Sequence, residues 1–230
     1  MVEAGRQAAR AHAVHQRLLE HYGEPRWRNP LPSLDELVST ILSQNTNDTN
    51  RDRAYQALRE RFPTWEQVRD APPDQVVLAI RPAGLGNQKG PRIQQVLGEI
   101  TAQRGELDLE FLADLPSEAA SDWLQGFKGV GPKTAAIVLL FSLGKPAFPV
   151  DTHIYRVSGR IGLRPEKMSV EQAHQHLAGL LQPDMYYAAH LNLIRLGREI
   201  CQARRPNCSI CPIQDVCDYY KRLSANTQEV

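Results

Sequence analysis

Four cysteines lie close together near the C-terminal end of the chain, and the rest of the chain contains none. Their spacing, C-x6-C-x2-C-x5-C, is that of a ligand set, and it favours an iron–sulfur cluster. Four thiolates also suit tetrahedral zinc, but structural zinc sites usually pair two short knuckles, and only Cys208 and Cys211 form one here. Disulfide frameworks are typical of small secreted domains, and four unligated cysteines would rarely cluster by chance. We therefore expect a reducing compartment and one [4Fe–4S] cluster, with zinc as the alternative, bound by Cys201, Cys208, Cys211 and Cys217.

A glycine-rich turn interrupts the helical run at 124–140, LQGFKGVGPKTAAIVLL. Gly129 and Gly131 permit a tight turn, and Pro132 suits the first helical position because the N–H that proline lacks would be unpaired there. Backbone N–H groups would then face outward at a helix N-terminus and form an anion site. A helix–hairpin–helix binds DNA phosphates in this way without reading bases. An ordinary αα-hairpin is the alternative, and the Pro-Lys-Thr-Ala continuation favours the DNA-binding motif.

Lys133 stands in the first turn of the second helix, where a positive charge opposes the helix macrodipole. The dipole and partial desolvation both favour the neutral amine, which is the form that a Schiff-base nucleophile requires. A lysine that binds phosphate is the alternative.

Asp151 lies in the segment FPVDTHIYRV, where Pro149 imposes extended backbone before the next helix begins. Its simplest role is that of an N-cap, which aspartate often fills. A capping carboxylate stays ionised and fixed, so capping and catalysis are compatible. We expect His153, a lone histidine, to be structural.

The composition is that of a globular protein whose net charge is close to zero. The chain has 230 residues, of which 42% are hydrophobic, and its formal net charge is +1. A nucleic-acid partner would therefore have to be bound by a local basic patch. Apolar runs of membrane-spanning length are lacking, and the start MVEAGRQAARAHAVHQ is too polar for a secretion signal. We expect a soluble, cytoplasmic protein.

Hydrophobic periodicity predicts helices along nearly the whole chain, and no sustained alternation of β-branched residues indicates a strand. We therefore expect an all-α protein. Ser33 is a candidate N-cap of the second helix, which would turn Leu37, Ile41 and Leu42 inward. The predicted helices cover 4–22, a segment from about 33, 49–61, 64–70, 73–80, 87–103, 117–126, 132–143, 151–161, 169–182 and 184–200.

Taken together, GVGPKTA, VDTHIYRV and the cysteine loop resemble the endonuclease III family of DNA glycosylases with AP-lyase activity. The resemblance extends from about Leu31 to Cys217. It implies two helical domains with the active cleft between them. One is a six-helix barrel at 31–145, with its helix–hairpin–helix at about 117–143. The other is discontinuous, at 1–30 and 146–230, and carries the [4Fe–4S] cluster loop at 201–217.

The resemblance also implies the chemistry. Lys133 would attack C1′ of a damaged nucleotide, the base would leave, and the Schiff base would allow β-elimination that cuts the strand on the 3′ side. Asp151 would assist Lys133 and stabilise the cationic sugar. The expected substrate is double-stranded DNA with damaged bases, by family default oxidised pyrimidines, or with abasic sites. We expect a monomer, with no membrane partner, in the nucleoid of a bacterial or archaeal cell.

The damaged nucleotide must leave the duplex, at a few kcal/mol of unstacking, and wedge residues fill the gap. Candidate wedges are Gln44 and Asn45 in ILSQNTND and Leu85 in PAGLGNQKG, with a buried loop leucine as the alternative for Leu85. Arg204 and Arg205 form a local basic spot, which Lys128, Lys133 and Arg156 could extend. The residues that we expect to contact DNA are Gln44, Asn45, Leu85, Lys128, Gly129, Val130, Gly131, Arg204 and Arg205.

Departures from the family pattern bear on lesion preference rather than on chemistry. The hairpin carries Lys128 and Pro132 where the family commonly has proline and arginine, and Gly86 replaces a common aromatic. An adenine-mismatch glycosylase would place glutamate near Ser39, and a thymine-mismatch glycosylase usually has tyrosine at the position of Lys133. A paralogue that acts mainly as an abasic-site lyase or as a DNA-binding protein is the remaining alternative, although a purely binding one should have lost Lys133 or Asp151.

Overall fold

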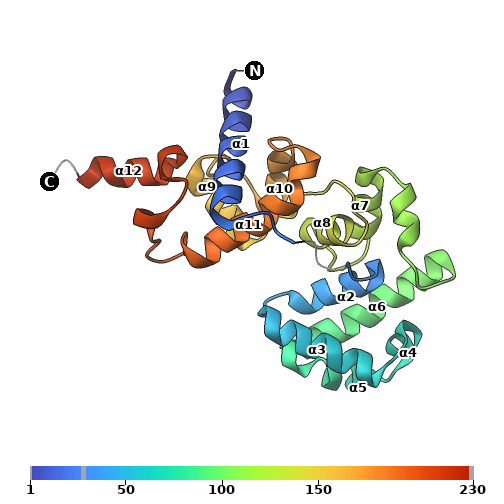
Figure 1. Cartoon of the computed structure of the whole chain (residues 1–230). Coiled ribbons are helices and arrows are strands. Elements are labelled where there is room, and N and C mark those ends of the chain that lie inside the picture. The colour runs from blue at the N-terminus through green and yellow to red at the C-terminus, as the bar shows by residue number, and fades with distance from the viewer. Residues whose placement is uncertain (1, 27–29, 228–230) are drawn as a thin grey trace. The chain divides into compact units, whose positions relative to one another are not determined.

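The structure is a computed structural model that describes residues 2–26 and 30–227 of the chain. Within these ranges the backbone forms α-helices and short 3-10 helices but no strand, which confirms the all-α prediction (Figure 1). None of the described helices combines the length and the apolar character needed to cross a membrane. The chain divides into a central unit, Asn29–Lys145, and a terminal unit, Met1–Arg28 with Pro146–Val230.

The central unit packs its helices in pairs around buried aliphatic side chains. Its helices are α2 (Ser33–Ser43), α3 (Asp48–Arg61), α4 (Trp65–Asp70), α5 (Pro73–Ala79), the 3-10 helix η1 (Arg81–Ala83), α6 (Gly86–Arg104), the 3-10 helix η2 (Glu110–Asp114), α7 (Ser117–Gln125) and α8 (Pro132–Phe141). Helix α2 lies against α3 and α8, and α6 lies against α4 and α5. Leu37, Ile41 and Leu42 of α2 are fully buried, as predicted. Each such burial stabilises the fold by about 1.5–3 kcal/mol.

The N-terminus of α2 differs from the prediction. Pro32 occupies the N-cap position, and Ser33 is the first helical residue. The Ser33 hydroxyl donates to Oε1 of Glu110 at 2.8 Å. The prediction that Ser33 is the N-cap is therefore wrong, because a distant carboxylate on η2 takes the hydroxyl that local capping would have used.

The terminal unit is formed by α1 (Val2–Tyr22), α9 (Thr152–Ile161), α10 (Val170–Ala178), the 3-10 helix η3 (Pro183–Met185), α11 (Tyr186–Glu199), the 3-10 helices η4 (Cys208–Ile210) and η5 (Gln214–Val216), and α12 (Asp218–Thr227). Helix α11 lies against α1 and α9. The predicted helix 169–182 ends earlier, at Ala178, with Gly179 as its C-cap, and Gln182, which precedes a proline, adopts extended backbone. Helix α12 was not predicted.

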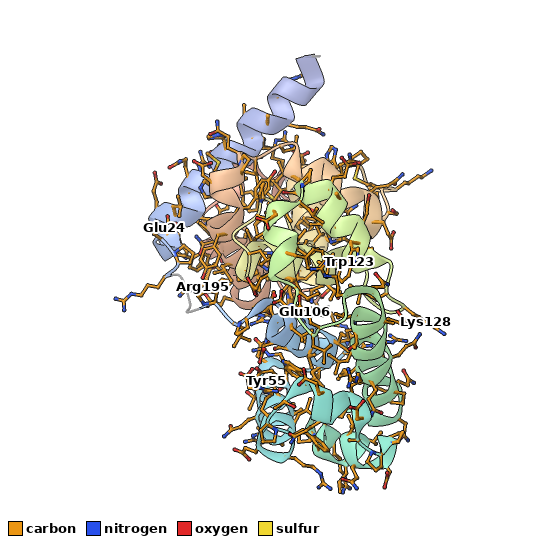
Figure 2. All side chains as sticks on the ribbon, turned by 90° about the vertical axis from the view of Figure 1, so that its right-hand side faces the viewer. Glu24, Tyr55, Glu106, Trp123, Lys128 and Arg195 are labelled. Carbon is orange, nitrogen blue, oxygen red and sulfur yellow. The ribbon has the colours of Figure 1, made fainter. Side chains whose placement is uncertain are left out.

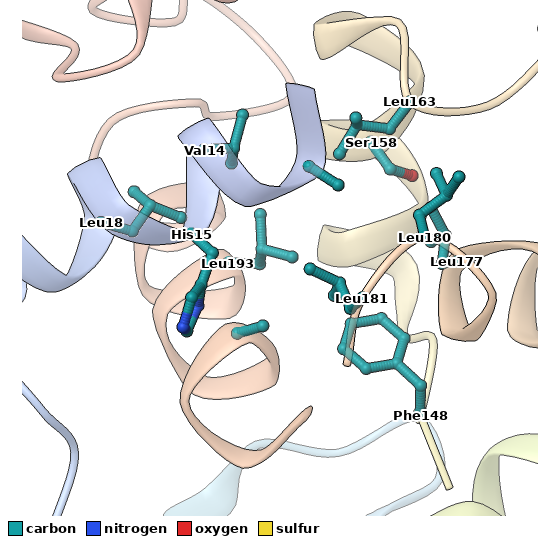
Figure 3. A pocket seen from close by; sticks show the side chains of 12 residues that line it. Val14, His15, Leu18, Phe148, Ser158, Leu163, Leu177, Leu180, Leu181 and Leu193 are labelled. Atoms are coloured by element: carbon teal, nitrogen blue, oxygen red, sulfur yellow. The ribbon is translucent and has the colours of Figure 1, made fainter. Parts of the chain in front are cut away.

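Beneath α1, apolar side chains surround a small cavity (Figure 3). Val14 and Leu18 of α1 face Leu193 of α11 and Phe148 across it. His15 also lines the cavity, and in the described part of the chain its Nδ1 atom has no hydrogen-bond partner. Burial lowers the pKa of His15, which favours the neutral ring. The cavity is thus a packing space of the core with one neutral imidazole on its wall.

The glycine turn lies between α7 and α8. Phe127 is buried and packs edge-to-face on Trp123, with the ring centroids 4.8 Å apart; Trp123 is labelled in Figure 2. Gly129 adopts φ +87°, whereas Gly131 has φ −95° and ψ −179°, an extended conformation that any residue adopts. Pro132 begins α8, as predicted. The backbone conformation therefore requires glycine at position 129 but not at position 131.

The positive φ of Gly129 predicts that alanine there has the opposite effect on stability from alanine at a helical glycine of the central unit. Gly129→Ala should lower the free energy of unfolding by about 1–2 kcal/mol, because alanine is strained at positive φ. Gly98→Ala, inside α6 with open space at its Cβ position, should raise it by about 0.5–1 kcal/mol. Urea unfolding measures both, and effects of the same sign would contradict the assignment.

Candidate functional site

The hairpin turn is held by side chains from elsewhere in the central unit. Nε2 of Gln44 donates to the carbonyl oxygen of Gly129 at 3.2 Å. Arg92 of α6 lies across the same glycine, so closely that a Cβ on Gly129 would be 2.4 Å from the Arg92 Cδ atom. Because α8 begins at Pro132, the N–H groups of its first turn have no acceptor within the helix. The turn therefore presents backbone donors from a braced position, as an anion site requires.

Lys133 is the second residue of α8 and is partly buried. Val130 before it and Thr134 after it are both buried, so the hairpin and the first turn of α8 are fixed by packing on either side of the lysine. The amine of Lys133 stands on a rigid helix start, beside backbone N–H groups that can bind phosphate. It is therefore suited to attack an atom that lies next to a bound phosphate group.

Asp151 caps α9 in the terminal unit. Its Oδ1 atom accepts a hydrogen bond from the backbone N–H of Ile154 at 2.7 Å, so the capping role is confirmed. The segment before it is fixed by His190, whose Nδ1 atom lies 3.0 Å from the carbonyl oxygen of Pro149. The carboxylate has a second oxygen that this cap does not use. A fixed carboxylate of this kind can stabilise positive charge that develops on a substrate.

The four cysteines line one cavity in the terminal unit. Leu196 and Ile200 of α11 contribute to its apolar wall. Burial raises the pKa of Cys211 to about 11, and negative charge on Cys201, Cys217 and Cys208 raises it as well. Burial also raises the pKa of Cys208, as do Cys201 and Cys217. Thiols in these surroundings become thiolates when a cation neutralises them, so the donor set fits a metal cluster.

Two arginines of α9 fasten the start of the cysteine loop. Nη1 of Arg160 donates to the Gln202 carbonyl oxygen at 2.7 Å and to the sulfur of Cys201 at 3.3 Å. Nε of Arg156 donates to the Cys201 carbonyl oxygen at 3.2 Å, and its Nη2 donates to the Gly197 carbonyl oxygen at 2.8 Å. Arg156 therefore supports the loop rather than forming a free part of a basic patch. Arg160 was missed, although the four-residue spacing of the two arginines places them on one helix face.

Exposed basic side chains remain at three of the predicted positions. Arg204 and Arg205 are both exposed in the loop between Cys201 and Cys208, and Arg205 adopts φ +54°. Lys128 is exposed in the central unit, at the hairpin (Figure 2). Each unit thus offers cationic side chains to solvent.

Two of the predicted wedge residues share an unusual backbone conformation. Asn45, which is exposed, has φ +53°, and Leu85 has φ +50° and is 48% exposed. The alternative of a buried loop leucine for Leu85 is therefore wrong. At leucine such left-handed backbone costs of the order of 1–3 kcal/mol, and it concentrates at functional sites, whereas asparagine adopts it more readily. Gln44, by contrast, directs its amide to the hairpin.

Known families match most of the chain. Residues 38–183 match the model of the HhH-GPD superfamily of base excision DNA repair proteins. Residues 201–217 match the iron-sulfur binding domain of endonuclease III. The cysteine site is therefore an iron–sulfur site.

Individual relatives agree with the family models. Endonuclease III of Thermotoga maritima is 34% identical over 189 residues, which cover 81% of this chain and 83% of that protein. The Arabidopsis thaliana protein At3g47830 is 36% identical over 174 residues, 76% of this chain, but the match spans only 59% of the relative. A solved structure of a non-covalent complex of endonuclease III with DNA has a TM-score of 0.80 at 24% identity and covers 95% of this chain and 98% of its own. The chain belongs to the endonuclease III family of the HhH-GPD superfamily of base excision DNA repair proteins.

Proposed function

We propose that this protein is a base excision repair DNA glycosylase with AP-lyase activity. Its substrates are double-stranded DNA with damaged pyrimidines, above all oxidised pyrimidines, and double-stranded DNA with abasic sites. The protein acts on them as a monomer. The observation that carries the proposal is Lys133, an amine in the first turn of the helix that follows the glycine hairpin. Members of the same family without lyase chemistry have no need of an amine at this place.

The proposed reaction uses the amine as a nucleophile and the carboxylate as a charge partner. Neutral Lys133 attacks C1′, the bond from C1′ to the base breaks, and the base leaves with the electron pair and takes up a proton. Opening of the sugar ring, with a proton added to its oxygen, gives the Schiff base. Loss of a proton from C2′ then breaks the bond between C3′ and the phosphate oxygen, and water releases Lys133. Asp151, fixed by its cap, stabilises the positive charge near C1′ and accepts the proton that the amine loses.

DNA binding in this proposal rests on local contacts, because the net charge of +1 gives little general attraction. Gly129, Val130 and Gly131 present backbone to the phosphates at the hairpin, and Lys128 adds charge beside them. Arg204 and Arg205 bind the DNA backbone from the cysteine loop. Asn45 and Leu85 fill the space left by the extruded nucleotide, while Gln44 braces the hairpin.

We further propose that the iron–sulfur cluster is of the [4Fe–4S] type. One cavity is lined by all four cysteines, Cys201, Cys208, Cys211 and Cys217. Their spacing, C-x6-C-x2-C-x5-C, supports this cluster type, because structural zinc sites usually pair two short knuckles and only Cys208 and Cys211 form one here. When bound, the cluster cross-links the loop that carries Arg204 and Arg205.

Borohydride trapping on abasic-site DNA tests the role of Lys133. The wild-type protein should form a covalent adduct, and Lys133→Gln should form none, with strand cleavage at least about 10³-fold slower because the nucleophile is gone. Lys128→Gln, a lysine of the same hairpin, is the control. It should still trap but bind DNA more weakly, with a smaller salt dependence. If wild type and Lys133→Gln both fail to trap, the lyase proposal is wrong.

Asp151→Asn separates the charge of Asp151 from its capping role, because asparagine caps a helix as well as aspartate does. Turnover should fall by about 10²-fold or more, while DNA affinity and the free energy of unfolding stay close to wild type. Asp151→Ala should lose turnover and, in addition, about 1 kcal/mol of stability. Single-turnover cleavage and urea unfolding measure these effects. Normal cleavage by Asp151→Asn would refute the assigned role.

The cluster type can be read from the purified protein. Anaerobically purified protein should be brown and contain about four irons and four acid-labile sulfides per chain. Cys211→Ser should lower the iron content and reduce DNA binding. A colourless protein with one stoichiometric zinc would overturn the cluster assignment.

A further inference from the structure

Lys89 is buried in the first turn of α6, a position that conflicts with elementary electrostatics. Its side chain is 3% exposed, and burial lowers the pKa of the amine. A positive charge at this end of a helix also opposes the macrodipole. In the described part of the chain Lys89 forms no ion pair that would offset these costs. A leucine or methionine would fill the same space without them.

Two backbone carbonyl groups compensate for the burial of Lys89. Its Nζ atom donates to the carbonyl oxygen of Leu42 at 2.8 Å and to that of Ala83 at 2.9 Å. Leu42 lies in the last turn of α2, and Ala83 ends η1, so both carbonyls stand at helix ends, where partners within the helix run out. The negative end of the α2 dipole adds to the attraction. One ammonium thus joins the ends of two helices.

The two joined helix ends lead into the two turns that carry the wedge residues. Asn45 follows Leu42 closely in sequence, and Leu85 follows Ala83. Both residues adopt left-handed backbone, which asparagine tolerates but which at Leu85 persists only where the surroundings hold it. Lys89 bonds to the chain just before each of them. Arg92, one turn further along α6, lies across Gly129 of the hairpin.

We propose that Lys89 is a positioning residue that holds the Asn45 and Leu85 turns as one rigid pair, so that both side chains enter the DNA together. This inference rests on the wedge role of Asn45 and Leu85 in the proposed function. A rigid pair has little conformational entropy to lose on insertion, so it lowers the free energy needed to keep a nucleotide out of the duplex. The contribution of Lys89 should therefore be specific to duplex DNA, because single-stranded DNA leaves no gap to fill.

Lys89→Met removes both hydrogen bonds while keeping an unbranched side chain. The matched control is Lys145→Met, since Nζ of Lys145 also donates to a backbone carbonyl of the central unit, that of Ala113 at 2.7 Å. Rates of borohydride trapping are compared on one abasic strand, single and in duplex, with 2-aminopurine fluorescence beside the site as a reporter of unstacking. For Lys89→Met the ratio of duplex rate to single-strand rate should fall by about tenfold, with a smaller fluorescence rise. Lys145→Met should keep the wild-type ratio.

Each outcome decides between the alternatives. A wild-type ratio for folded Lys89→Met, or equal losses on duplex and single strand, would overturn the positioning role. Failure of the wild-type protein to trap at all would instead refute the proposed lyase function. If Lys89→Met does not fold, Lys89→Arg retains the charge, but its longer side chain and planar guanidinium do not fit the space of the compact ammonium between the two carbonyl oxygens. It should show the same duplex-specific loss, and an unchanged ratio would reject the inference.

Discussion

Every short helix leaves the N–H groups of its first turn and the carbonyl groups of its last turn without partners inside the helix. A protein built from many short helices has many such ends, and the candidate functional residues of this chain stand at them. Lys133 lies at the start of α8, Asp151 caps α9, and Leu85 occupies the N-cap position of α6. The carbonyl ends of α2 and η1 are taken by Lys89. Unsatisfied helix ends thus carry the proposed anion site, the fixed carboxylate and the anchoring points of the Asn45 and Leu85 turns.

Helix α9 shows how one element can serve two functional regions of the same unit. Asp151 at its N-terminus is held by a cap of 2.7 Å, and its later turns carry Arg156 and Arg160, which fasten the chain at Cys201. The guanidinium groups bind carbonyl oxygens and one sulfur, so their charge supports the loop instead of extending into solvent. Arg204 and Arg205 are left as the exposed cations of that loop. Two arginines thus support the loop while two others are exposed on it, and in this way a nearly neutral protein offers positive charge at a defined place.

The hairpin of the central unit is likewise held in place by side chains from elsewhere in the same unit. Of the two hairpin glycines only Gly129 has a positive φ. The packing of Phe127 on Trp123, the amide of Gln44 and the side chain of Arg92 all hold the turn. A turn fixed in this way keeps its N–H groups oriented, which the proposed binding of phosphate requires. Preorganisation of this kind lowers the entropy lost on binding.

The sequence by itself determined the helical class, most helix positions, the cysteine ligand set and the family, because periodicity, proline and glycine breaks and ligand spacing are local properties. It also placed Pro132 at a helix start and Asp151 as a cap. It did not reveal that Ser33 binds Glu110, that Arg156 and Arg160 support the cysteine loop, or that Lys89 joins two helix ends. The partners in these contacts are 77, 45, 42 and 47 residues apart in sequence. Only the tertiary structure decided them, since a long polar side chain takes whichever unsatisfied group the packing of distant helices brings within reach.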